Sequence, residues 1–261
     1  MLNYIYLYIN QWHNNPLILG LIAGLIITVF NTVGALLVLF AYKTISQKFL
    51  DLILGFAAGL MLAASFTSLI IPGIKVGGVW PVVLGIMLGA FCIDFANNHI
   101  PHTHWLLKSN KISKKISPLV LFILAITIHN MPEGLSVGIA IGSNHLKEAI
   151  PLMIAIGIQN VPEGFSVAFS HFAENSQSKL RSAWIGIASG LVEIPLAILG
   201  VFLVSFISPI LPYAMGFGAG AMLYVISNEI IPQTHNKGYE RIATTGTIIG
   251  IILMLVLDMG L

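Results

Sequence analysis

Charged side chains are scarce in this chain of 261 residues, since they make up only 8% of it. Soluble domains carry about 25% charged residues, whereas here hydrophobic residues reach 57% and the mean hydropathy is +0.92. So few charges cannot cover a surface that faces water. Because an open structure in lipid must satisfy its backbone within each segment, the sequence predicts an all-α integral membrane protein. The formal net charge of +2 is too small to indicate nucleic acid as a partner.

Cysteine is scarcer still, because Cys92 is the only one in the sequence. This excludes an intrachain disulfide framework and any metal site built from several thiolates. An intramembrane metalloprotease needs H-E-x-x-H on one helix, and that motif is absent. We also expect no serine nucleophile elbow of the G-x-S-x-G type. The sequence therefore predicts a protein that is not an enzyme.

Eight stretches are long and apolar enough to cross a bilayer, which takes about 20 residues. We expect membrane helices at Leu17–Tyr42, Leu50–Pro72, Val79–His99, Pro118–Gly142, Glu148–His171, Ser182–Phe206, Pro209–Pro232 and Arg241–Gly260. Residues 1–261 are thus predicted to form a single transmembrane transporter domain. The longest connection, residues 100–117, is predicted to be a solvated loop.

Lysine and arginine gather in alternate loops. Ten of the twelve basic residues fall in the loops that join spans one and two, three and four, five and six, and seven and eight. Only Lys75 and Lys147 fall on the other side. Basic loops stay in the cytoplasm, so both termini are predicted outside it. The short chain favours a prokaryotic plasma membrane, in which the protein would be multi-pass.

Two pairs of spans repeat one another. Residues 125–142, AITIHNMPEGLSVGIAIG, resemble residues 155–172, AIGIQNVPEGFSVAFSHF, and residues 55–72 resemble residues 216–232 with one residue of slippage. In each pair the copies are an odd number of spans apart, so they cross the membrane in opposite directions. This pattern is typical of the inverted repeats of secondary transporters, whose site lies near the midplane on helices interrupted by Gly or Pro. We expect Pro132 and Pro162 to interrupt spans four and five.

Polar residues near the middle of spans four, five and six are the main candidate metal ligands. They are His129, Asn130, Glu133, Gln159, Asn160, Glu163 and Glu193. A charge at that depth costs about 2.5–3.5 kcal/mol, and no Lys or Arg lies deep enough to pair with the three glutamates. Protons alone would leave the imidazole and amide oxygens unused, whereas a divalent ion uses every group. Without thiolates the set suits Zn²⁺, Fe²⁺, Mn²⁺, Co²⁺ or Cd²⁺. It is large enough for two ions bridged by Glu133 and Glu163.

A second group of polar residues, mostly nearer the predicted cytoplasmic side, is a weaker candidate for a metal pathway. It comprises Asp94, His99, His102, His104, His171, Asn228 and Glu229. The histidines around residue 100 are explained equally well as part of an interfacial loop facing water. Glu229 lies close to a membrane end, where water lowers the cost of its charge.

The motifs HNMPEG in span four and QNVPEG in span five, with the Glu193–Pro195 pair in span six, resemble the ZIP family of divalent-metal transporters. The resemblance covers nearly the whole chain. It implies import of Zn²⁺ or a related ion by alternating access, with a mobile unit of spans one, four, five and six against a scaffold of the other four. It implies one metal site of His129, Glu133, Gln159 and Glu163. It implies a second site of Asn130, Glu133, Asn160, Glu163 and Glu193. Gln159 and Asn160 depart from family members that carry His and Asp there.

The alternative function is a proton-coupled carrier of a small organic cation, with Glu133 and Glu163 as proton sites. A pocket for such a substrate needs aromatic walls, and only Phe165 and Phe169 lie near the acids in sequence. We expect no cofactor besides the transported ion, and the lipid bilayer as the main partner. A homodimer stays open, because the small-residue pairs Gly20–Gly24 and Gly246–Gly250 permit helix contacts within or between protomers.

Overall fold

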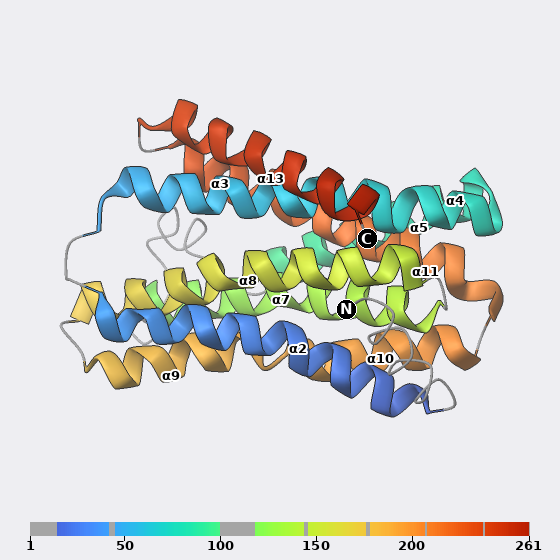
Figure 1. Cartoon of the computed structure of the whole chain (residues 1–261), viewed down its shortest axis with the longest axis horizontal. Coiled ribbons are helices and arrows are strands. Elements are labelled where there is room, and N and C mark those ends of the chain that lie inside the picture. Colours follow the sequence, from blue (N-terminus) through green and yellow to red (C-terminus); the bar gives the residue numbers. More distant parts are fainter. Residues whose placement is uncertain are drawn as a thin grey trace.

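The computed structural model describes residues 15–41, 45–99, 118–143, 146–175, 178–206, 208–236 and 238–260, and every regular element among them is a helix (Figure 1). Within these ranges seven stretches are long and apolar enough to cross a membrane. They are Leu17–Phe40, Gln47–Gly77, Val79–Ala96, Leu146–Ala173, Lys179–Ser205, Leu211–His235 and Glu240–Met259. The prediction of an all-helical membrane protein is therefore confirmed.

The helices follow the predicted spans and extend most of them. Their bounds are α2 (Pro16–Leu36), α3 (Gln47–Ala64), α4 (Ile71–Gly77), α5 (Val79–His99), α7 (Pro118–Gly142), α8 (Leu146–Asn175), α9 (Lys179–Gly190), α10 (Glu193–Phe206), α11 (Leu211–Val225), α12 (Ile231–His235) and α13 (Glu240–Gly260). Span two, predicted to end at Pro72, continues to Gly77 because proline is tolerated in the first turn of α4.

The expected interruption of spans four and five by proline is wrong. Helices α7 and α8 pass through Pro132 and Pro162 without a break, as membrane helices can when their neighbours compensate. The interruption lies instead in span six, where two residues in a turn separate α9 from α10. Pro195 contributes to it, because a residue without an N–H cannot bond the carbonyl of Leu191. Glu193 therefore begins a new helix.

Spans two and seven each contain a π-helical segment at their centre. Ser65–Ile70 joins α3 to α4, and Ile226–Ile230 joins α11 to α12. The first has six residues and the second five, which accounts for the one-residue slippage between the repeats. Such π segments are frequent at functional sites. The short helices that follow lead to Gly78 and Gly238, which have positive φ angles of 81° and 84°.

Glycines allow the backbones of two helix pairs to touch. A Cβ at Gly59 of α3 would collide with the carbonyl oxygen of Thr247 on α13, and one at Gly220 of α11 with that of Ile86 on α5. Close approach through small residues is how membrane helices associate without a hydrophobic driving force. These contacts make α3 with α13, and α5 with α11, the two most extensive helix pairs among the described elements.

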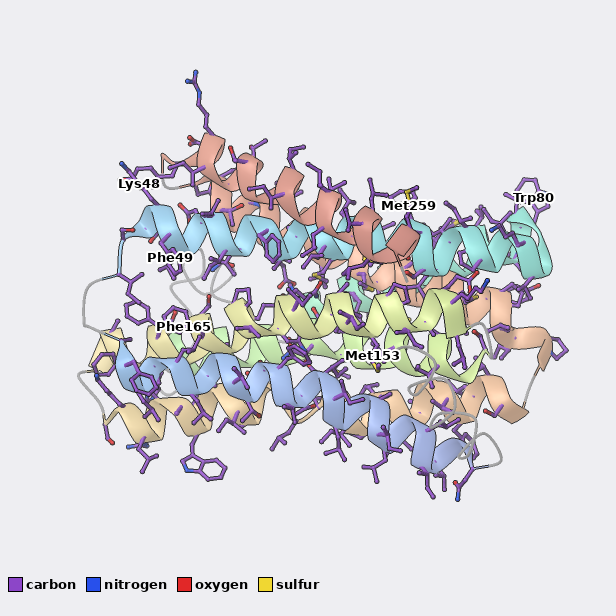
Figure 2. All side chains as sticks on the ribbon, viewed as in Figure 1. Lys48, Phe49, Trp80, Met153, Phe165 and Met259 are labelled. Carbon is purple, nitrogen blue, oxygen red and sulfur yellow. The ribbon has the colours of Figure 1, made fainter. Side chains whose placement is uncertain are left out.

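The glycine pairs left open by the sequence also serve contacts within the chain. Gly20 packs against Ile198 of α10, while Gly246 and Gly250 pack against the backbone of α3 near Leu52 and Phe56. On the outer faces, large apolar side chains such as Trp80, 77% exposed, and Met259, 90% exposed, project away from the bundle (Figure 2). Such a surface suits contact with lipid.

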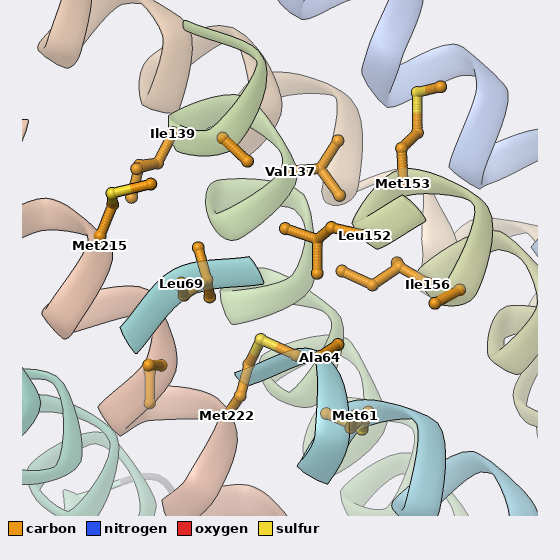
Figure 3. Packing of buried hydrophobic residues seen from close by; sticks show 14 of the residues in the cluster. Met61, Ala64, Leu69, Val137, Ile139, Leu152, Met153, Ile156, Met215 and Met222 are labelled. Carbon is orange, nitrogen blue, oxygen red and sulfur yellow. The ribbon is translucent and has the colours of Figure 1, made fainter. Parts of the chain in front are cut away.

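The helices form two groups with an apolar layer between them. Helices α2, α7, α8, α9 and α10 pack on one another, and α3, α5, α11 and α13 form the second group, which lies above the first in Figure 1. The buried side chains of the layer are contributed by both groups (Figure 3). They include Met61, Leu69, Met215 and Met222 on the second group and Val137, Leu152 and Ile156 on the first. Methionine side chains are flexible and adapt to irregular packing, so the side chains of this layer can repack.

Candidate metal centre

Three predicted ligands meet at the centre of the first helix group. Helix α7 places His129 and Glu133 one turn apart on one face, and α8 brings Glu163 beside them. One ligand atom from each of the three lies within 4.8 Å of the other two. The Nε2 atom of His129 is 3.9 Å from Oε1 of Glu133. All three side chains are buried, so this cluster is a compact, water-poor group of two acids and an imidazole.

Buried oxygens without a hydrogen-bond donor surround this cluster. In the part of the chain that the structure describes, no donor reaches Asn130 Oδ1, Glu133 Oε2, Gln159 Oε1, Asn160 Oδ1, Glu163 Oε1 or Glu163 Oε2. Buried polar atoms are normally paired, and each exception needs an explanation. All of these atoms are acceptors. A group of acceptors without donors is what a cation requires.

The side-chain nitrogens of the three amides donate hydrogen bonds to oxygens of the protein. Gln159 donates through Nε2 to Glu133 Oε1 at 2.9 Å, and Asn160 donates through Nδ2 to Glu193 Oε1 at 2.7 Å. Asn130 donates through Nδ2 to the carbonyl oxygen of Ser189 at 3.1 Å. Each amide thus has its donor end fixed and its oxygen unpartnered. This arrangement fits amides that act as oxygen ligands.

Glu193 differs from the other two glutamates because both of its oxygens accept hydrogen bonds. Oε1 accepts from Asn160, and Oε2 accepts from Thr28 Oγ1 at 3.2 Å. The sequence placed Glu193 among the ligands, whereas the structure places its carboxylate behind Asn160, outside the group of His129, Glu133 and Glu163.

Glu229, a weak candidate from sequence, lies close to the cluster. Its Oε2 is 3.8 Å from Nδ1 of His129, on the ring nitrogen opposite the one that faces Glu133. Glu229 belongs to the π-helical segment of span seven. The imidazole therefore lies between two carboxylates from different helix groups.

The other weak candidates lie elsewhere. Asp94 accepts from Tyr224 Oη at 2.5 Å, which joins α5 to α11. His171 is buried and its Nδ1 is bonded to Ser182 Oγ at 2.9 Å, so it links α8 to α9. Asn228 is exposed. The side chain of His99, and all of His102 and His104, lie outside the described residues.

Two polar residues on α2 were missed by the sequence reasoning. Thr28 contacts Glu193, and Asn31 donates through Nδ2 to the carbonyl oxygen of Gly186 at 2.9 Å. Both are buried. A signal was present, because Thr28, Asn31 and Thr32 are the only polar residues between Leu17 and Phe40. Residues three apart share one helix face, which marks that face as turned away from lipid.

One motif contradicts the expectation that no serine elbow occurs. Residues 134–138 read GLSVG and match G-x-S-x-G. In hydrolases that serine sits on a sharp turn between a strand and a helix. Ser136 instead lies inside the continuous helix α7, fully buried beside Gly218 of α11. The geometry therefore rejects a nucleophile elbow.

Comparison with known proteins identifies the family. The model of a family described as ZIP Zinc transporter matches residues 107–258. The chain is 38% identical to the zinc transporter ZIPB of Bordetella bronchiseptica, over 97% of this chain and 83% of that protein. It is 36% identical to the zinc transporter GufA of Myxococcus xanthus, over 93% of this chain and 98% of the relative. It is 32% identical to human zinc transporter ZIP11, over 87% and 93% of the two chains. As its paired motifs predicted, this chain belongs to the ZIP family of zinc transporters.

Proposed function

We propose that this protein carries divalent transition-metal ions, Zn²⁺ foremost, across the membrane into the cytoplasm. The observation that carries the proposal is the buried group of His129, Glu133 and Glu163, whose ligand atoms converge within 4.8 Å among acceptors that lack donors. Imidazole and carboxylate together suit Zn²⁺ and its neighbours better than Mg²⁺ or Cu⁺. The bacterial and human relatives are named zinc transporters, which supports Zn²⁺ as the main substrate.

The proposed site holds two ions that share Glu163 and Glu133. One ion takes His129 and Gln159 as further ligands, and the other takes Asn130, Asn160 and, directly or through Asn160, Glu193. Glu163 is suited to bridging because neither of its oxygens meets a donor among the residues that the structure describes. Glu133 keeps Oε2 for a second ion while Oε1 accepts from Gln159.

We propose eight membrane spans, the seven described above together with α7, which has 25 residues. Lys48, Lys179, Arg181 and Arg241 lie where α3, α9 and α13 begin, at one end of the bundle. Lys48 and Trp80 mark the two ends in Figure 2. The positive-inside rule makes the Lys48 end cytoplasmic, and both termini then lie outside. In a Cys92→Ser background, an impermeant maleimide should label Lys75→Cys and not Lys48→Cys in intact cells; the reverse labelling would contradict this orientation.

An inverted repeat is supported by contacts that recur at a constant spacing. Gly55 meets Ala243 as Gly216 meets Val82, and Gly59 meets Thr247 as Gly220 meets Ile86. In each case the equivalent residues are 161 positions apart (82 and 243, 86 and 247). The proposed axis exchanges α3 with α11, α5 with α13, and α7 with α8.

We propose that transport proceeds by movement of the first helix group past the second. Within each group, glycines bring helix backbones into contact, as at Gly34 with Val161 and at Gly59 with Thr247. Between the groups lies the methionine-containing layer of Figure 3, whose flexible side chains can repack. The metal ligands on α7 and α8 would move with the first group, while Glu229 stays on the second.

Metal flux into proteoliposomes tests the proposed function. Purified protein would be reconstituted and offered Zn²⁺, Fe²⁺, Mn²⁺, Co²⁺, Cd²⁺ or Mg²⁺, with protein-free vesicles as the control. We expect saturable uptake of Zn²⁺ and weaker or no uptake of Mg²⁺. Vesicles that take up none of the six ions at a rate above the control would contradict the proposal.

A further inference from the structure

The polar side chains of α2 face the interruption between α9 and α10, just before Glu193. Thr28 Oγ1 lies 3.3 Å from the carbonyl oxygen of Gly190 and 3.2 Å from Glu193 Oε2. Asn31, one turn further along α2, bonds the carbonyl oxygen of Gly186. Thr28 is 5% exposed and Glu193 is 0% exposed, so water does not compete for these contacts. The one hydroxyl proton of Thr28 is shared between these two acceptors, and Asn31 supplies a further donor from α2 before the break.

The orientation of the Glu193 carboxylate is set by two donors from different helices. Asn160 on α8 donates to one oxygen, and Thr28 on α2 donates to the other. With only one of these bonds the carboxylate could turn about its terminal torsion, which is broad. With both, its plane is fixed. The amide of Asn160 is oriented with it, because Nδ2 donates to Glu193 Oε1 and, at 3.4 Å, to the carbonyl oxygen of Ile27, while Oδ1 meets no donor among the described residues.

Backbone packing keeps α2 in the position that this contact requires. A Cβ at Gly190 would collide with Nδ2 of Asn31, and a Cβ at Gly164 would collide with the backbone oxygen of Asn31. Gly164 directly follows Glu163, and Gly190 lies at the break. Helix α2 is thus wedged between the two elements that carry Glu163 and Glu193, and its Thr28 hydroxyl has a defined place.

We propose that Thr28 is a positioning residue for metal binding. Its hydroxyl holds Glu193, and Glu193 in turn holds Asn160 with its oxygen free for the ion. This role rests on the proposed function and deepens it. Helix α2 carries none of the predicted ligands, yet through Thr28 it would set the orientation of Asn160. The His129 side is held independently by Gln159 and Glu133.

Zn²⁺ uptake by Thr28→Val and Thr28→Ser variants in proteoliposomes tests this role. Valine keeps the shape and removes the hydroxyl, and serine keeps the hydroxyl. For Thr28→Val we expect KM to rise about tenfold and the maximal rate to change less. A factor of about ten is the lower end of the loss seen when a residue that orients a metal ligand is removed. Thr28→Ser should restore wild-type KM. Thr247→Val is the matched control, because among the described residues the Thr247 hydroxyl bonds only the carbonyl oxygen of Ala243 on its own helix.

A double-mutant cycle separates positioning from a general structural role. In a Glu193→Ala background, Thr28→Val should change Zn²⁺ affinity, measured by titration of the purified protein, by less than about twofold, since the partner it positions is gone. An equal loss in both backgrounds would overturn the proposal. So would a Thr28→Val variant with wild-type KM when wild-type protein transports Zn²⁺. Absence of transport by the wild type would instead overturn the proposed function.

Discussion

Gln159 donates a hydrogen bond to Oε1 of Glu133 at 2.9 Å and so joins helices α7 and α8, which carry the repeated motif. The bond orients the carboxylate, and the amide oxygen of Gln159 has no hydrogen-bond partner in the described part of the chain. The amide thus supplies the donor that holds Glu133, and in the proposed site its oxygen would be offered to the ion.

Replacing Gln159 by leucine should therefore weaken metal binding in two ways. The variant loses an oxygen ligand and the donor that orients Glu133, and we expect Zn²⁺ affinity to fall by about 10–100-fold. Titration of purified protein with Zn²⁺ measures the change. Gln159→His is the control, since an imidazole supplies a ligand and should bind at least as tightly as the wild type. Unchanged affinity in Gln159→Leu would show that Gln159 does not belong to the site.

His129→Ala should alter metal preference more than it lowers overall transport. Imidazole favours Zn²⁺ over Mn²⁺, whereas carboxylate and amide oxygens favour Mn²⁺ relative to Zn²⁺. We expect the ratio of Zn²⁺ to Mn²⁺ uptake at low concentration to fall by about tenfold, with Glu133 and Glu163 still present. Competition of the two ions for uptake into proteoliposomes gives this ratio directly. A variant that loses uptake of both ions equally contradicts the role of the imidazole in selectivity.

Glu229→Gln should weaken Zn²⁺ uptake less than loss of a bridging glutamate. Its carboxylate lies 3.8 Å from Nδ1 of His129, while Nε2 lies 3.9 Å from Oε1 of Glu133. A carboxylate on the second ring nitrogen fixes the tautomer of a ligating histidine, and its loss costs about tenfold or more in affinity. Measured KM for Zn²⁺ should rise accordingly. Gln233→Ala, a change at an exposed position of α12, is the control and should leave KM unchanged.

Gly59→Ala and Gly220→Ala should lower stability by similar amounts. Each added Cβ would collide with a backbone carbonyl of the partner helix, at Thr247 and Ile86 respectively. Overpacking of this kind costs about 1–3 kcal/mol, which thermal unfolding in detergent can detect. Gly73→Ala is the control, because its Cβ would meet only side chains of Val82 and Met215. A large loss in one variant and none in the other would argue against the inverted repeat.

Much of the site followed from the sequence because spacing alone determines which side chains share a helix face. His129 and Glu133 are one turn apart, and the near-copy in span five places Glu163 at the same depth. In the structure ligand atoms of the three side chains lie within 4.8 Å of one another, and their binding of a metal stays a prediction. The membership in a family of transporters also bears out the choice of a transporter over a hydrolase.

The remaining features depend on tertiary contacts that spacing does not encode. Helix α7 continues through Pro132, whereas the chain turns after α9. The carbonyl oxygens of Ser189 and Gly190, at the end of α9, accept hydrogen bonds from α7 and α2 respectively. Glu229 appeared to belong to a membrane end, yet the π-helical segment places it beside His129. Thr28 carries no charge, and its spacing along the chain does not show that its hydroxyl bonds the Glu193 carboxylate.

Zn²⁺ uptake by Glu163→Gln is the most direct test of the metal site. Within the described part of the chain no donor reaches either Glu163 oxygen, and the side chain is 4% exposed. Glutamine keeps the shape of the side chain and replaces an anionic oxygen by an N–H₂ donor that repels a cation. Glu240→Gln, at an exposed position where α13 begins, is the matched control. We expect uptake into proteoliposomes to fall to the level of protein-free vesicles in Glu163→Gln and to stay at the wild-type rate in the control. Saturable uptake by Glu163→Gln with wild-type KM and maximal rate would contradict the account.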